Sequence, residues 1–164
     1  MLSRKTEPQE MVTLLNEVFS HFDRLVERHG LEKIKTIGDS YMLVGGLPLP
    51  RDDHAAAVAE MALDMIEDVA RINAQNQRQI SIRVGINSGP VVAGVIGKKK
   101  FTYDLWGDTV NLASRMESAG TPNAIHVSPS THAALVGKYE LAERGLVSCK
   151  GLGEITTYYL TGRK

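Results

Sequence analysis

Two lysines and an acid stand close together early in the chain, in the segment Lys33-Ile34-Lys35-Thr36-Ile37-Gly38-Asp39. Alternate residues of a strand share a face, so this spacing predicts both lysines on one face of a strand that leads into a tight turn. Such a pair is compatible with a local site for an anion. The ordinary alternative is an edge strand with solvated lysines and an aspartate that suits the turn geometry.

A second group of polar residues lies in the later half of the chain. The segment Tyr103–Asp108 ends an aromatic-rich strand, and for Asp104 within it a structural and a functional role remain equally open. Asp108 is best explained as the cap of the next helix. Asn111 and Arg115 are four residues apart on that helix and so project from one face, although surface solvation would also account for Arg115. Lys150 stands beside glycines, as in loops that approach phosphates but also in ordinary turns.

The elements that must position these residues follow from hydrophobic periodicity and from turn residues. A capping box formed by Thr6 and Gln9 predicts the start of a first helix, and Gly30 predicts its end. The remaining predicted elements are strands 31–37 and 41–44, a helix 53–74, strands 80–86, 91–96 and 101–106, a helix 108–118, a strand 124–127, a helix after Ser128 and a strand 156–160. This order predicts helices packed on a mixed sheet, and a strand before Met1 would complete a βαββαβ core.

Composition narrows the class of protein. The 164 residues suit one domain, and the 19 basic and 19 acidic residues cancel, which argues against a protein that coats nucleic acid or an anionic membrane. The single cysteine, Cys149, excludes an intramolecular disulfide framework and suits a reducing compartment. No apolar run reaches the roughly 18–20 residues that span a bilayer, and the first residues do not resemble a signal peptide.

Three segments taken together closely resemble the catalytic domain of class III nucleotide cyclases, with bacterial adenylate cyclases as the nearest resemblance. They are KIKTIGDSYM at 33–42, RVGINSGPVVAGVIG at 83–97 and YDLWGDTVNLASRME at 103–117. Lys150-Gly151 and the closing strand also fit the family. The resemblance runs from Thr6 onward and implies an α+β fold, a ferredoxin-like βαββαβ cyclase core with additional C-terminal strands and a helix. It implies a single domain over 1–164.

The resemblance also implies the roles of five residues in the conversion of ATP to 3′,5′-cyclic AMP and pyrophosphate. Lys35 and Asp104 would recognise adenine, and Asn111 would orient the ribose. Arg115 would stabilise the transition state, and Lys150 would hold the β- and γ-phosphates. A lysine donor and an aspartate acceptor match N1 and the 6-amino group of adenine, whereas guanine presents the reverse polarity. Guanylate cyclase is therefore the minor alternative, since those enzymes usually carry an acid in place of such a lysine.

The resemblance further implies two divalent metal ions, Mg²⁺ or Mn²⁺, with Asp39 as the second of two metal-binding carboxylates. The first carboxylate of the family lies on an opening strand, and the chain starts after the place of that motif, so we expect it to be truncated at its N-terminus. In this family the site lies across a dimer interface, which implies a symmetric homodimer with two equivalent sites.

The absence of the first carboxylate keeps a second class of function open, a non-catalytic cyclase-like module that binds a nucleotide or a regulatory partner. For either function the expected setting is a cytoplasmic domain. We expect no nucleic-acid partner and no membrane contact within this segment. Attachment to a larger membrane-bound or sensor-linked protein is compatible with the family.

Overall fold

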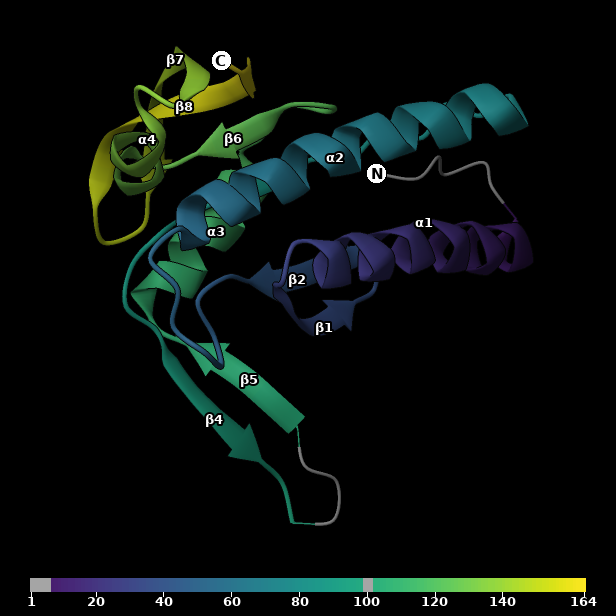
Figure 1. The fold of residues 1–164 in the computed structure, drawn as a ribbon, viewed down its shortest axis with the longest axis horizontal. Coiled ribbons are helices and arrows are strands. Elements are labelled where there is room, and N and C mark those ends of the chain that lie inside the picture. The colour runs from purple at the N-terminus through teal and green to yellow at the C-terminus, as the bar shows by residue number, and fades with distance from the viewer. Residues whose placement is uncertain (1–6, 99–101) are drawn as a thin grey trace. The chain divides into compact units, whose positions relative to one another are not determined.

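The computed structural model describes residues 7–98 and 102–164, and the chain divides into two compact units, Met1–Ile82 and Arg83–Lys164 (Figure 1). The first unit contains α1 (Pro8–Arg28), β1 (Glu32–Ile37), β2 (Ser40–Val44) and α2 (His54–Asn76). Thr6 lies outside the described residues, and Glu7 occupies the N-cap position with Pro8 in the first turn of the helix. None of the described helices is both long and apolar enough to cross a membrane.

The core of the first unit forms where the apolar stripes of α1 and α2 meet beneath the β1–β2 hairpin. Apolar residues that recur at helical spacing form these stripes and are buried, with Val18, Phe22 and Leu25 on α1 and with Met61 and Val69 on α2. Aromatic rings extend this core to the hairpin. The ring of Tyr41 meets the rings of Phe19 and Phe22 edge-on, at centroid distances of 5.3 and 5.6 Å.

The strand predicted over 80–86 is shorter in the structure, where β3 spans only Val84–Ile86. The reason is a side chain that replaces a ladder partner. The Asn73 Nδ2 donates to the Ile80 carbonyl at 2.8 Å, and the Ile80 N–H donates to the Asn73 Oδ1 at 2.8 Å. Because both backbone groups of Ile80 are satisfied by α2, this segment is an anchored connection.

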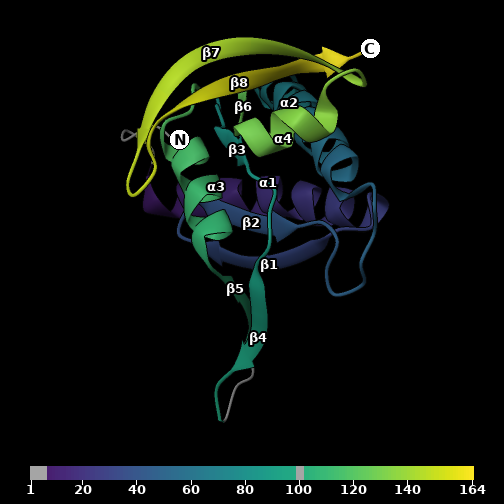
Figure 2. The same ribbon diagram turned by 90° about the vertical axis from the view of Figure 1, so that its left-hand side faces the viewer.

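The second unit begins with β3 and contains a four-stranded sheet in the order β3-β6-β8-β7. Its elements are β3, β4 (Val92–Ile96), β5 (Thr102–Trp106), α3 (Asp108–Ser118), β6 (Ile125–Val127), α4 (Pro129–Leu135), β7 (Tyr139–Cys149) and β8 (Gly153–Arg163). β3 pairs with β6 in parallel, and β8 runs antiparallel to both β6 and β7. β4 and β5 form a separate antiparallel hairpin that projects away from this sheet (Figure 2). The predicted start of β5 at Phe101 lies outside the described residues.

The long strand β7 is missing from the predicted elements, and β8 is longer than the predicted 156–160. Two register shifts interrupt β7, one between Glu140 and Leu141 and one between Glu143 and Gly145. Each shift breaks the alternation of apolar and polar residues by which a strand is recognised. Apart from these differences, the run α1-β1-β2-α2-β3 is the predicted order, and the mixed α+β class is confirmed.

Candidate active site

The two lysines of β1 lie on opposite faces of the hairpin, which corrects the prediction that they share one. Lys33 is paired with Leu43, but Lys35 is paired with Met42, because a bulge between the two lysines adds one residue to β1. Leu43 and Met42 are consecutive and so point to opposite faces, and their cross-strand partners follow them. The bulge depends on the pairing of the strands, and spacing alone could not reveal it.

Lys33 is committed to holding the hairpin against α1. Its Nζ lies 3.0 Å from the Asp23 Oδ1 and 5.1 Å from the centre of the Tyr41 ring, and the Tyr41 hydroxyl donates to the same carboxylate at 2.6 Å. Partial burial opposes ionisation of Asp23, but the hydrogen bonds from Tyr41 and Lys33 hold the pKa of Asp23 below its ordinary value. Burial and then the hydrogen bond to Asp23 raise the pKa of Tyr41. Lys35, which is half-buried on the other face, is outside this cluster.

Asp39 lies at the tip of the hairpin, in a loop one residue shorter than predicted. Ile37 pairs directly with Ser40, so the loop contains only Gly38 and Asp39, and Gly38 adopts φ +57°. Positive φ at the first loop position is typical of the type II′ turn, where glycine carries no steric penalty. The Asp39 side chain is exposed and makes no hydrogen bond or ion pair with a described residue.

Asp39 fits one part of a metal site. Its carboxylate is a hard oxygen ligand of the kind that Mg²⁺ prefers, and Mg²⁺ commonly takes one or two carboxylates together with substrate phosphates. Within residues 7–98 and 102–164 there is no group of three or more histidine, cysteine, aspartate or glutamate side chains that could hold a metal ion. The described part of the chain therefore offers no closed cage for a metal ion.

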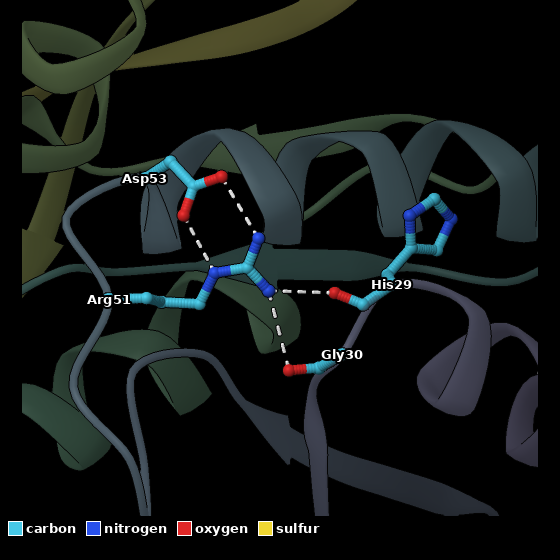
Figure 3. Close-up of polar contacts among 4 residues, drawn as sticks. All are labelled: His29, Gly30, Arg51 and Asp53. Atoms are coloured by element: carbon cyan, nitrogen blue, oxygen red, sulfur yellow. Dashed lines mark hydrogen bonds and ion pairs between the residues drawn. The ribbon is translucent and has the colours of Figure 1, made fainter.

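Arg51 closes the open end of the same hairpin (Figure 3). Its Nη1 donates to the carbonyls of His29 and Gly30, at 2.8 and 3.4 Å, just before β1 begins. Its Nε and Nη2 form a fork with the Asp53 carboxylate, at 2.7 and 2.9 Å, just before α2. No motif in the sequence indicates the role of Arg51, because its contacts join positions 21 and 22 residues apart.

Asp104 sits in the middle of β5, opposite Gly94 of β4. Its side chain is half-buried, and its Oδ1 accepts a hydrogen bond from the Leu105 N–H at 2.8 Å. Alternation along β5 places Asp104 and Trp106 on one face and the buried Leu105 on the other. Asp104 therefore presents a carboxylate acceptor whose orientation is fixed by its own strand.

Asn111 and Arg115 lie on α3, as predicted, and Arg115 is the better anchored of the two. The Arg115 Nε donates to the Ser148 carbonyl at 2.9 Å, while its Nη atoms make no hydrogen bond to a described residue. The guanidinium is thus oriented by one edge and offers the other for a bidentate contact to an oxyanion. The Asn111 side chain is exposed and makes no hydrogen bond to a described residue.

Lys150 begins the turn between β7 and β8, two residues after the carbonyl that holds Arg115. The Leu152 N–H donates to the Cys149 carbonyl at 3.0 Å, and Gly151 and Gly153 take φ +83° and +72°. Lys150 is exposed on this glycine-supported turn. In the second unit, the Arg115 side chain is thus anchored to the backbone two residues before Lys150. In the first unit, Lys35 and Asp39 share one hairpin.

Comparison with known proteins identifies the class of enzyme to which this arrangement corresponds. A family model described as "Adenylate and Guanylate cyclase catalytic domain" matches residues 1–162. The adenylate cyclase of Mycobacterium tuberculosis (strain ATCC 25618 / H37Rv) is 48% identical over 159 residues, which are 97% of this chain and 36% of that protein. Guanylate cyclase soluble subunit beta-2 of Rattus norvegicus is 50% identical over 156 residues, 94% of this chain and 23% of that protein.

Among solved structures, the guanylate cyclase domain of RhGC from Catenaria anguillulae in complex with GTP superposes with a TM-score of 0.92 and 41% identity. The match covers 99% of this chain and 89% of that chain. The chain therefore belongs to the class III nucleotide cyclase family, as a catalytic domain. It spans about a third or less of the length of the curated relatives named above.

Proposed function

We propose that this chain is the catalytic domain of an adenylate cyclase, which converts ATP to 3′,5′-cyclic AMP and pyrophosphate. The observation that carries the proposal is the chemistry of Lys35 and Asp104, one hydrogen-bond donor and one acceptor. The bulge in β1 separates Lys35 from the structural cluster around Asp23, and Asp104 is oriented by the Leu105 N–H at 2.8 Å.

The polarity of this pair favours adenine. Adenine accepts at N1 and donates from its 6-amino group, so a lysine and an aspartate satisfy both positions. Guanine donates from N1 and accepts at O6. The lysine donor would then face the N1–H donor, and the aspartate acceptor would face the O6 acceptor. Leaving two buried polar groups unpaired costs about 1–3 kcal/mol each, which is enough for strong discrimination.

The remaining residues of the proposed site act on the sugar and the phosphates. Asn111 hydrogen-bonds the ribose and holds the 3′-oxygen in line with the α-phosphorus. The Nη atoms of Arg115 bind the oxygens on which negative charge grows during the transfer, and Lys150 binds the leaving phosphates. Divalent metal ions, bound in part by Asp39, would lower the pKa of the 3′-hydroxyl and neutralise phosphate charge.

The same residues are proposed to act in a homodimer. Cyclase domains of this family bind a nucleotide substrate and function as dimers. In the proposed assembly, one protomer supplies the metal ligand Asp39 and its partner supplies the base, ribose and phosphate contacts. One chain carries both sets, so two equivalent sites form. A cytoplasmic location of the domain is part of this proposal.

Guanylate cyclase is the second candidate, because the rat relative at 50% identity is a guanylate cyclase subunit and the Catenaria domain binds GTP. The test is product formation by the protein at its full encoded length, with Mn²⁺ and with ATP or GTP offered separately. Cyclic AMP from ATP, in excess of cyclic GMP from GTP, is the expected result. A preference for GTP would overturn the assignment of Lys35 and Asp104. No product from either nucleotide, from a protein shown to be dimeric, would favour a non-catalytic module.

A further inference from the structure

A polar network at the end of β3 centres on Asn87, a residue without a role in the proposed reaction. The Ser128 and Ser130 hydroxyls lie 2.6 and 2.9 Å from its Oδ1 and donate to it from the start of α4. Its Nδ2 donates to the Thr109 carbonyl of α3 at 3.0 Å. The Thr109 carbonyl can only accept, so the amide end that faces it is the nitrogen, and the orientation of the amide is determined. Asn87 therefore joins the end of β3 to α4, through hydrogen bonds that it accepts, and to α3, through a hydrogen bond that it donates.

Two further contacts pin α3 to β3 and to the segment that follows it. At its C-terminal end the helix lies so close to β3 that a Cβ on Gly85 would come within 2.1 Å of the Glu117 nitrogen. At its N-terminal end the Thr109 hydroxyl donates to the Pro90 carbonyl at 2.6 Å. The bond from Asn87 to Thr109 lies at the same N-terminal end. α3 is thus fixed at both ends rather than along one side.

A helix fixed at both ends cannot rotate about its axis, and this matters for the side chains that α3 presents. Asn111 and Arg115 are four residues apart and therefore share one face of α3, so a rotation of the helix moves both side chains together. Arg115 also depends on this orientation to keep its Nε within 2.9 Å of the Ser148 carbonyl. Errors near 1 Å in the position of catalytic groups can cost about 10²-fold in rate.

We infer that Asn87 is a positioning residue for the cyclase reaction, which sets the rotation of α3 and through it the placement of Asn111 and Arg115. The inference rests on the proposed function, in which those two side chains contact the ribose and the phosphates. The Asn87 amide acts on α3 through its Nδ2 donor, because only the Nδ2 hydrogen bond reaches that helix. The acceptor end holds α4 and is not required for the placement of Arg115.

The test uses Asn87→Asp in the protein at its full encoded length, with Ser130→Ala as the matched control. Asn87→Asp keeps the shape and the acceptor for Ser128 but loses the donor to Thr109. Ser130→Ala removes the contact with the Asn87 Oδ1, together with contacts to the Ser88 carbonyl and the Ser128 hydroxyl, and leaves the Asn87 donor to Thr109 in place. We expect Asn87→Asp to lower kcat for ATP by about 10²-fold with little change in KM, and Ser130→Ala to leave kcat close to that of the unchanged protein.

A double-substitution cycle with Arg115→Ala separates positioning from general loss of stability. Because Asn87 acts in part through Arg115, Asn87→Asp should lower kcat by a smaller factor in the Arg115→Ala background than in the unchanged protein. Losses that multiply, or a KM effect without a kcat effect, would overturn the inference. If the unchanged protein forms no cyclic nucleotide, the proposed function fails and hydrogen exchange decides the structural part. Faster exchange of α3 amides in Asn87→Asp, but not in Ser130→Ala, supports the positioning role, and unchanged exchange overturns it.

Discussion

At the scale of single residues, two lysines of the same strand have different surroundings and therefore different expected roles. Lys33 forms an ion pair with Asp23 and its ammonium group lies over the Tyr41 ring, so both contacts stabilise the packing of the hairpin on α1. Lys35 is turned to the opposite face by the bulge in β1. A substitution at one position should affect stability, and the same substitution at the other should affect the choice of base.

Exchanging the polarity of the base-recognising pair is expected to change nucleotide preference. In the protein with Lys35→Glu and Asp104→Gly, the ratio of kcat/KM for ATP to that for GTP should fall by at least about 10²-fold, because the lysine donor becomes a carboxylate acceptor for the guanine N1–H and the aspartate acceptor for the adenine amino group is removed. Initial rates with each nucleotide measure this ratio.

The control for the Lys35→Glu part of this exchange is Lys33→Glu, which makes the same charge change as Lys35→Glu two residues away. The new carboxylate faces Asp23, so the free energy of unfolding should fall, while the ATP-to-GTP ratio should stay as in the unchanged protein. A change of the ratio by Lys33→Glu as large as that by the exchange would contradict the assignment of Lys35.

His126 is a second residue whose surroundings have a measurable consequence. It is fully buried, with Nδ1 2.7 Å from the Met116 carbonyl and Nε2 2.8 Å from the Thr157 hydroxyl. A carbonyl only accepts, so the neutral ring carries its proton on Nδ1. Burial lowers the pKa of His126 from 6.5; the Met116 carbonyl partly opposes this, and the charges of Arg144 and Arg115 reinforce it.

Stability should consequently fall at acid pH. In the unfolded chain His126 gains a proton below about pH 6.5, whereas in the folded chain it stays neutral to lower pH, so the free energy of unfolding should decrease as pH falls through this window. Urea unfolding between about pH 5 and 8 measures the slope. His126→Gln should flatten the slope, and the control His132→Gln, at a half-buried ring stacked on Tyr158, should retain it. An equal slope in His126→Gln would contradict this explanation.

At the scale of elements, the close approach of α3 to β3 is what fixes the helix that carries Asn111 and Arg115. The contact needs a residue without a side chain, since a Cβ on Gly85 would lie 2.1 Å from the Glu117 nitrogen and 2.6 Å from the Met116 carbonyl carbon. Both are backbone atoms, which cannot move aside as the end of a side chain can. An ion pair from the Arg83 Nε to the Glu117 Oε1, at 3.1 Å, lies beside the same contact.

Gly85→Ala is therefore expected to lower the free energy of unfolding by about 1–3 kcal/mol or more, because the helix must move off the strand. Chemical denaturation measures this loss. Gly162→Ala is the matched control, since its Cβ would meet only the end of the Glu140 side chain at 3.3 Å, and it should cost far less. Similar losses in both variants would show that the α3–β3 contact is not tight in solution.

At the scale of the whole molecule, the proposed homodimer divides the residues of each site between protomers. In this proposal Asp39 would act in one site, and Arg115 of the same chain would act in the other. Asp39→Asn and Arg115→Ala should therefore each inactivate both sites of their own homodimers. A heterodimer of the two variants combines both changes in one site and leaves its second site intact.

Mixing equal amounts of the two inactive proteins should restore activity to about a quarter of that of the unchanged protein, because half of the dimers are heterodimers with one intact site each. Cyclic nucleotide formation, assayed after exchange of subunits, measures the recovery. The control mixes two separate preparations of Asp39→Asn, and this mixture should recover no activity. No recovery from the complementary pair, with exchange of subunits demonstrated, would exclude shared sites.

The sequence by itself determined the helices, most of the strands and the family. The buried faces of α1 and α2 follow from apolar residues three and four apart, and α3 places Asn111 and Arg115 together for the same local reason. These features depend on residues within one or two turns of each other, so the sequence contains their full cause. The roles of the individual site residues, including Lys150 and Asp39, stay predictions until activity is measured.

Only the tertiary structure decided the facing of Lys35, the extent of β7 and the support of α3. The bulge that separates Lys35 from Lys33 exists only when β1 pairs with β2, and the two register shifts of β7 exist only when it pairs with β8. Asn87 and Thr109 are 22 residues apart and meet because α3 packs on β3. Register and packing are properties of pairs of elements, and the residues of one element do not contain them.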